Sequence, residues 1–112
     1  MNKFENLRLA GCKCDGVVND LDPFVVMDDR HTIIHVLLGE YDELICAGFY
    51  IHTDGFDRKV FPNPENGRYQ SERDAKIYIL ALIIDSYSNL LPPEIIAIVR
   101  LARDQCRQME MF

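Results

Sequence analysis

The spacing of hydrophobic positions changes once along the chain, near the Asn66-Gly67 dipeptide. Before this point, short apolar runs are separated by turn-forming residues, which is typical of β-strands. After it, the apolar positions repeat with the period of an α-helix. The pattern predicts an α+β fold, with an antiparallel β-meander of four to five strands followed by two C-terminal helices packed on one face of the sheet. The expected strands are residues 6–12, 23–27, 31–38, 44–53 and 57–61.

Two start signals place the helices. Ser71 followed by Asp74 has the spacing of an N-terminal capping signature, and residues 76–86 are apolar nearly all round, as in a helix buried on more than one side. Proline has no N–H, and the N–H groups in the first turn of a helix have no partner within the helix. The Pro92-Pro93 pair therefore predicts the start of the second helix. The apolar stripe of that helix is expected to comprise Ile95, Ile98, Val99, Ala102, Cys106 and Met109.

The Asp54-Gly55 dipeptide predicts a two-residue hairpin connection between Thr53 and Phe56. A type I′ turn requires positive φ at both central residues, and Asp-Gly is among the pairs that favour it. This connection sets His52 opposite Asp57 on the following strand.

The preceding connection is expected to be five residues long, from 39 to 43, which pairs Leu38 with Ile45 and sets His31 opposite His52. Alternate residues of a strand face opposite sides of the sheet, and in this register the two sides differ in chemistry. The side expected to lie under the helices carries Ile34, Val36, Leu38, Ile45, Ala47, Phe49, Ile51 and Val60. The other side carries His31, His35, Cys46, Tyr50, His52, Asp57 and Lys59, with Ile33, Leu37 and Phe61.

In this arrangement His31, His52 and Asp57 form a row across three neighbouring strands. Directly opposed residues have Cβ atoms roughly 5 Å apart, so two imidazoles and a carboxylate fit around one divalent metal ion, or the carboxylate orients a histidine. The alternative is an ordinary cross-strand ion pair between His52 and Asp57 on a solvated face. The row is the candidate metal site of this chain.

Composition indicates one domain. The chain has 112 residues, 48% apolar and 27% charged, without a repeat or a linker. Its longest apolar run is too short to cross a bilayer and its N-terminus lacks a signal-peptide pattern, so we expect a cytoplasmic protein without membrane association. The four cysteines are expected to be reduced. Cys12 and Cys14 form a C-x-C pair whose role stays open between soft-metal binding and ordinary packing.

The formal charge is −6 and the acidic residues are unevenly placed. Between residues 15 and 57 there are ten acidic residues against one basic residue, Arg30. An acidic surface suits a cationic partner, or serves only to keep a small protein in solution. Net negative charge also argues against binding to nucleic acid.

Two basic or aromatic clusters are candidates for contact with a partner. Arg100, Arg103 and Arg107 fall on one stripe of the second helix, where they suit an acidic partner or simply form a solvated face near the negative end of the helix dipole. Arg68 and Tyr69 lie in the proline-containing loop 61–70, and rigid exposed loops often carry contacts.

Three large side chains of the first helix predict self-association. Tyr78, Leu82 and Tyr87 lie on faces that one sheet and one helix are not expected to cover fully. Exposed apolar patches often mark interfaces, so we expect a homodimer.

The sequence contains none of the common short catalytic motifs, such as G-x-x-x-x-G-K, G-x-S-x-G or H-E-x-x-H. We therefore expect a small binding or regulatory module that contacts a protein partner or a second copy of itself. The alternative is a metal-binding protein or metal-assisted hydrolase that uses His31, His52 and Asp57. Whether the chain catalyses a reaction, and which cofactor it holds, stay open from sequence.

Overall fold

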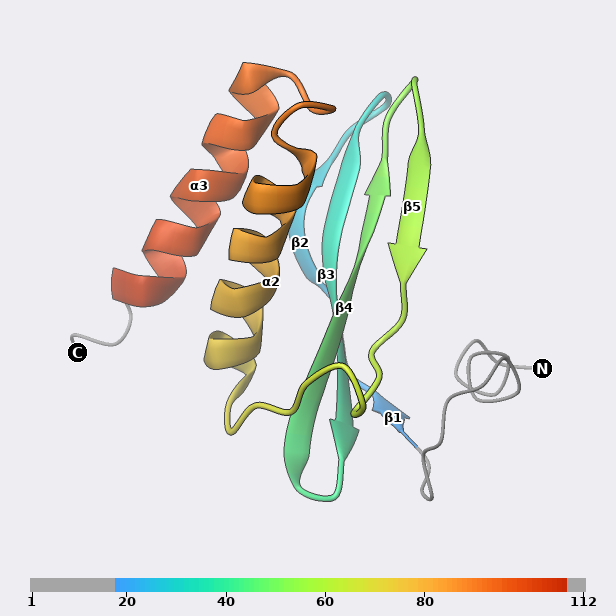
Figure 1. Cartoon of the computed structure of the whole chain (residues 1–112), viewed down its shortest axis with the longest axis vertical. Helices are drawn as coiled ribbons and strands as arrows, with labels where there is room; N and C mark the ends of the chain where they lie inside the picture. The colour runs from blue at the N-terminus through green and yellow to red at the C-terminus, as the bar shows by residue number, and fades with distance from the viewer. Residues whose placement is uncertain (1–17, 109–112) are drawn as a thin grey trace.

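The computed structural model describes residues 18–108, which form a five-stranded antiparallel sheet followed by two helices (Figure 1). Both helices lie on one face of the sheet, so the α+β fold expected from the sequence is confirmed. The expected strand at residues 6–12 lies outside the described residues. The elements are β1 (Asn19–Asp20), β2 (Phe24–Asp28), β3 (Ile33–Tyr41), β4 (Leu44–His52), β5 (Asp57–Val60), α2 (Glu72–Tyr87) and α3 (Pro93–Gln108).

The strands follow one another across the sheet as a meander. Two short strands share one edge of β3, because β1 pairs with Gly39 and Glu40 while β2 pairs farther along, between Ile33 and Val36. A bulge between Val25 and Met27 interrupts β2. β4 pairs with the other edge of β3, and β5 pairs with β4.

The predicted pairing of β3 with β4 is wrong by two residues. β3 continues to Tyr41, which pairs with Leu44, and the connection is a two-residue turn formed by Asp42 (φ 51°) and Glu43 (φ 66°). Gly39 lies within the strand because it is needed for close packing, not for a turn. A Cβ on Gly39 would lie 2.7 Å from Cγ1 of Val18.

A shift of two residues leaves every side chain on its predicted face, because the side-chain period of a strand is two. It changes the neighbours, however. Ile33 lies opposite His52, the position expected for His31. The predicted row of His31, His52 and Asp57 across three strands therefore does not form by direct pairing.

The connection from β4 to β5 has the predicted length and register but not the predicted turn type. His52 pairs with Asp57, and the N–H of Thr53 donates to the carbonyl of Phe56 at 2.9 Å. Neither Asp54 nor Gly55 has the positive φ of a type I′ turn. Instead, Oγ1 of Thr53 accepts hydrogen bonds from the N–H groups of Gly55 and Phe56, both at 3.1 Å, and this side-chain bonding stabilises the turn.

The main core lies between the sheet and the helices. α2 packs on β3 and β4, and α3 packs on α2 and β2. Phe49 and Ile51 are buried as predicted, while Val60 is half-buried against the same core. Within the described residues, neither helix is long and apolar enough to span a membrane.

Both predicted helix starts are confirmed within a few residues. Oγ of Ser71 accepts the N–H of Asp74 at 3.1 Å, which caps α2, and α3 begins at Pro93. The prediction for one member of the apolar stripe is wrong, because Ile98 is 37% exposed. Ile96, two residues earlier, is buried instead. The helix turns Ile96 toward the core because α3 packs against both α2 and β2, which widens its buried face. Ile95, Val99, Ala102 and Cys106 are buried, and Met109 lies outside the described residues.

A smaller cluster lies on the face of the sheet away from the helices. Val18 and Cys46 are buried there, with Tyr41 and Phe61 packed against them. The chain after β5 crosses this face so closely that a Cβ on Gly48 would lie 1.9 Å from the carbonyl oxygen of Val60. We call residues 61–62 the crossing segment.

Candidate functional site

Each histidine on the face away from the helices contacts a different aspartate. Nδ1 of His52 is hydrogen-bonded to the carboxylate of Asp57 on the neighbouring strand. Nε2 of His35 lies 3.2 Å from Oδ2 of Asp28. His31 Nδ1 lies 3.2 Å from an oxygen of Asp54, so this third pair joins the tips of two hairpins. The structure therefore has three separate histidine–carboxylate pairs, two on the strands of this face and one between the hairpin tips.

The candidate metal ligands are only partly brought together. His52 and Asp57 are in contact as expected, but His31 is directed to Asp54 because the β3–β4 register differs from the predicted one. Within residues 18–108, no three histidine, cysteine or acidic side chains are grouped to hold one metal ion. The assignment of His31, His52 and Asp57 as metal ligands stays a prediction.

Aromatic and cationic packing fills the rest of this face. The ring of Tyr50 stacks on His52, with ring centroids 6.5 Å apart, and meets the edge of His35 at 6.4 Å. Nζ of Lys59 lies 4.8 Å from the Tyr50 ring centroid and 5.4 Å from that of Phe61. These half-exposed contacts form a continuous side-chain ladder across β3, β4 and β5.

The predicted arginine stripe is present on α3. Arg100 and Arg107 are exposed, while Arg103 is half-buried and its Nε lies 3.4 Å from Oδ1 of Asp104. The role of this stripe in binding a partner stays a prediction.

The loop residues Arg68 and Tyr69 have structural contacts. Nε of Arg68 donates to the carbonyl of Pro64 at 3.2 Å, and its guanidinium lies 5.6 Å from the ring centroid of Tyr41. Tyr69 returns to the sheet, where it pairs with Ile45. A partner-binding role for either residue stays a prediction.

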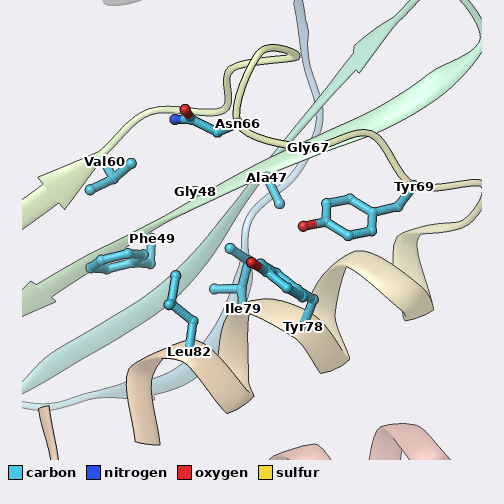
Figure 2. Close-up of a pocket in the computed structure, with 10 residues that line it drawn as sticks. All are labelled: Ala47, Gly48, Phe49, Val60, Asn66, Gly67, Tyr69, Tyr78, Ile79 and Leu82. Carbon is cyan, nitrogen blue, oxygen red and sulfur yellow. The ribbon is translucent and has the colours of Figure 1, made fainter. Parts of the chain in front are cut away.

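A pocket lies between α2 and the outer edge of β4 (Figure 2). Its volume is about 280 Å³. The sheet forms one wall, α2 forms another, and the loop before α2 closes part of the rim. The lining residues are Ala47, Gly48, Phe49, Val60, Asn66, Gly67, Tyr69, Tyr78, Ile79 and Leu82.

The pocket exists because the strand edge is interrupted. β5 ends at Val60, opposite Phe49, and the chain then leaves across the other face of the sheet. It returns at Tyr69, whose N–H and carbonyl both bond to Ile45, at 2.7 and 2.8 Å. Ala47 lies between these two paired positions, and its small side chain leaves room beneath the gap. We call this interruption the edge gap.

Two neighbouring tyrosine hydroxyls point into the pocket, that of Tyr69 from the loop before α2 and that of Tyr78 from α2 (Figure 2). The rings of Tyr69 and Tyr78 have centroids 5.4 Å apart. Burial, with a smaller contribution from Tyr78, raises the pKa of Tyr69, so its hydroxyl stays a neutral donor and acceptor well into the alkaline range. Gly67 (φ 150°) leaves space for this hydroxyl, because a Cβ there would lie 2.8 Å from it.

The pocket was not anticipated from the sequence. The weak signals were the Ala47-Gly48 pair in an otherwise bulky strand and the prolines that follow β5. No protein-family model, curated protein or solved structure matches the chain. The function is therefore inferred from the described side chains and strand edges alone.

Proposed function

We propose that this protein is a small binding module and that the pocket between α2 and β4 holds a neutral ligand with an apolar body. The observation that carries this proposal is a preformed pocket at an interrupted strand edge. Ligand sites are commonly apolar concavities with a few placed polar groups, and this pocket has that composition.

The lining explains why the ligand is neutral. None of the ten lining residues is charged, so a charged ligand would lose its hydration without gaining an ion pair. Phe49, Ile79 and Leu82 offer apolar surface, whose burial drives binding by about 25 cal/mol per Å². The hydroxyls of Tyr69 and Tyr78 then orient the ligand.

The size of the pocket limits the ligand to a small molecule. A cavity of about 150 Å³ holds benzene, so about 280 Å³ accommodates a single ring with substituents. Two of its walls belong to β4 and α2, both regular elements, so that part of the pocket does not have to be ordered when the ligand binds.

Titration with a neutral aromatic probe tests the proposal. Benzyl alcohol at millimolar concentration is expected to shift the amide resonances of Ala47, Tyr78 and Leu82 in a two-dimensional ¹H–¹⁵N spectrum. Leu82→Trp fills the pocket and should abolish these shifts. The matched control is Leu101→Trp on α3, where Leu101 is 58% exposed, and this variant should bind as the wild type does. Shifts that persist in Leu82→Trp, or that lie elsewhere, would contradict the proposal.

A second candidate function is metal binding by His31, His52 and Asp57. One observation favours it: Asp57 engages Nδ1 of His52 and thereby leaves Nε2 to face a metal, as carboxylates do behind many metal-bound histidines. Binding would require His31 to leave Asp54. Calorimetric titration with zinc should then show one site in the wild type and in His35→Ala but none in His52→Ala. Equal binding by all three proteins would end this second candidate.

A further inference from the structure

The edge gap exposes the backbone of one residue. Along a strand, the N–H and carbonyl of alternate residues point to the same neighbour. Ile45 bonds to Tyr69 on the outer edge of β4, and Thr53 bonds to Phe56 on that edge, so Ala47 points its N–H and carbonyl to the same side. Its backbone therefore faces the pocket that its side chain also lines.

Ala47 lacks a partner on this edge in the part of the chain that the structure describes. β5 supplies partners only as far as Phe49, and the return of the chain supplies one only at Ile45. Ala47 is only 7% exposed, and a buried backbone group without a hydrogen bond is costly. A ligand that satisfies both groups gains more than one that only fills the space.

A peptide strand does not fit this position. Val60 and Tyr69 occupy the same edge on either side of Ala47, so the gap is one residue pair long. A matching ligand must place a donor and an acceptor side by side within one small group. A carboxamide does this, because its N–H and carbonyl lie on neighbouring atoms.

We propose that the ligand of this pocket is a neutral carboxamide, whose N–H donates to the carbonyl of Ala47 and whose oxygen accepts the Ala47 N–H. This inference rests on the proposed binding function. Tyr69 provides the local precedent, because it makes the same reciprocal pair of bonds with Ile45. The carboxamide takes the place of the missing strand residue.

The geometry also places the rest of the ligand. Residues paired across antiparallel strands project to the same side of the sheet, and the side chain of Ala47 projects toward α2. The body attached to the carboxamide therefore lies on the helix side, between the positions of Val60 and Tyr69 and against Ile79 and Leu82. A carboxylate of the same shape is disfavoured, because it has no N–H to donate to the Ala47 carbonyl.

Three amides of one scaffold separate hydrogen bonding from burial. Benzamide presents an N–H and a carbonyl on the same side. N-Methylbenzamide is trans, so its N–H and carbonyl point in opposite directions and only one bond forms at a time. N,N-Dimethylbenzamide has no donor. We expect benzamide to bind about tenfold or more tightly than the dimethyl compound, with N-methylbenzamide between them, because each satisfied hydrogen bond adds to the affinity.

The amide resonance of Ala47 shows whether the ligand forms its hydrogen bond at this residue. Benzamide should move the amide proton of Ala47 downfield, as a new hydrogen bond does, and the dimethyl compound should not. Leu82→Trp should abolish benzamide binding, while Leu101→Trp should retain it. Equal affinities of the three amides and benzyl alcohol, with shifts still confined to the pocket, would overturn the carboxamide pairing and leave the proposed binding function standing. If none of the four compounds binds, both are overturned.

Discussion

The two faces of the sheet are stabilised in different ways. On the helix-covered face, Ile34, Val36 and Ile51 are fully buried in an apolar core. On the opposite face, half-exposed side chains form histidine–aspartate pairs and contacts between Lys59 and aromatic rings. The buried face holds the fold together, whereas exposed pairs contribute little stability and leave this surface free to vary. The exception is the crossing segment, which covers Gly48 and Cys46.

The largest contrast is expected between two isoleucines of neighbouring strands. Ile51→Ala removes a fully buried side chain and should lower the free energy of unfolding by about 4 kcal/mol, since both burial and packing are lost. Ile33→Ala is the control on the half-exposed face and should cost about 1 kcal/mol. Urea unfolding of both variants measures the difference. Equal losses would mean that the two faces contribute alike.

Gly48→Ala should break the rule that the face away from the helices is tolerant. The added Cβ would meet the carbonyl oxygen of Val60 at 1.9 Å, and backbone atoms cannot move aside as a flexible side chain does. We expect a loss of about 3 kcal/mol in chemical unfolding. Gly55→Ala is the matched control, because its Cβ would meet only Oγ1 of Thr53 at 3.8 Å, and it should change stability by less than about 0.5 kcal/mol.

The contact between His52 and Asp57 should contribute little to stability. The side chain of Asp57 is 66% exposed, so solvent screens the pair and the coupling energy should be about 0.5 kcal/mol. A double-mutant cycle with His52→Ala and Asp57→Ala at pH 6 measures it. The more exposed His31 and Asp54 pair should couple more weakly still. A coupling above about 2 kcal/mol would show that this face stabilises the fold after all.

The smallest effect is expected at the exposed turn between β2 and β3. The carboxylate of Asp29 accepts the N–H groups of His31 and Thr32, both at 2.8 Å, and these bonds lower its pKa. A carboxyl group whose pKa is lowered in the folded state stabilises the fold at pH values above its ordinary pKa. This stabilisation is lost as the pH falls through the lowered pKa. Asp29→Asn keeps an acceptor without the charge. As the pH falls from about 6 to about 2, the melting temperature of the wild type should therefore fall more than that of the variant, which thermal unfolding measures. Parallel curves would contradict this.

The two hairpins of the sheet show how far sequence reasoning carries. The Asp-Gly signal predicted the position and register of the β4–β5 connection but not its turn type, because the Thr53 side chain stabilises a turn without positive φ. The turn with positive φ at both residues lies instead at Asp42-Glu43, where neither residue is glycine or asparagine. Gly39 resembled a turn residue, yet it is required by contact with Val18. Tertiary packing, which the local pattern does not encode, decided that register.

The candidate sites differ in predictability for the same reason. Strand alternation identified the face that carries His52 and Asp57, because the period of two survives a shift of two residues, whereas His31 lies in the turn before β3. The β4–β5 register also predicted the contact between His52 and Asp57. The contact of His31 with Asp54 was missed because the β3–β4 register differs from the predicted one. The pocket depends on where β5 stops and where Tyr69 returns to Ile45, more than eight residues later. Such long-range geometry leaves only weak traces in the sequence.

The two buried cysteines allow local opening of the fold to be measured by thiol alkylation. Cys46 and Cys106 are thiols without a disulfide, and they are covered by different parts of the molecule. Cys46 packs against Phe61 of the crossing segment, whereas Cys106 belongs to α3 and is buried in the main core, and burial raises the pKa of the Cys106 thiol. In a Cys12→Ser, Cys14→Ser background, the alkylation rate of each thiol is set by how often its own cover lifts, once intrinsic reactivity is allowed for. Unequal rates would show that the strand crossing and the terminal helix open as separate units, on timescales that equilibrium unfolding does not resolve.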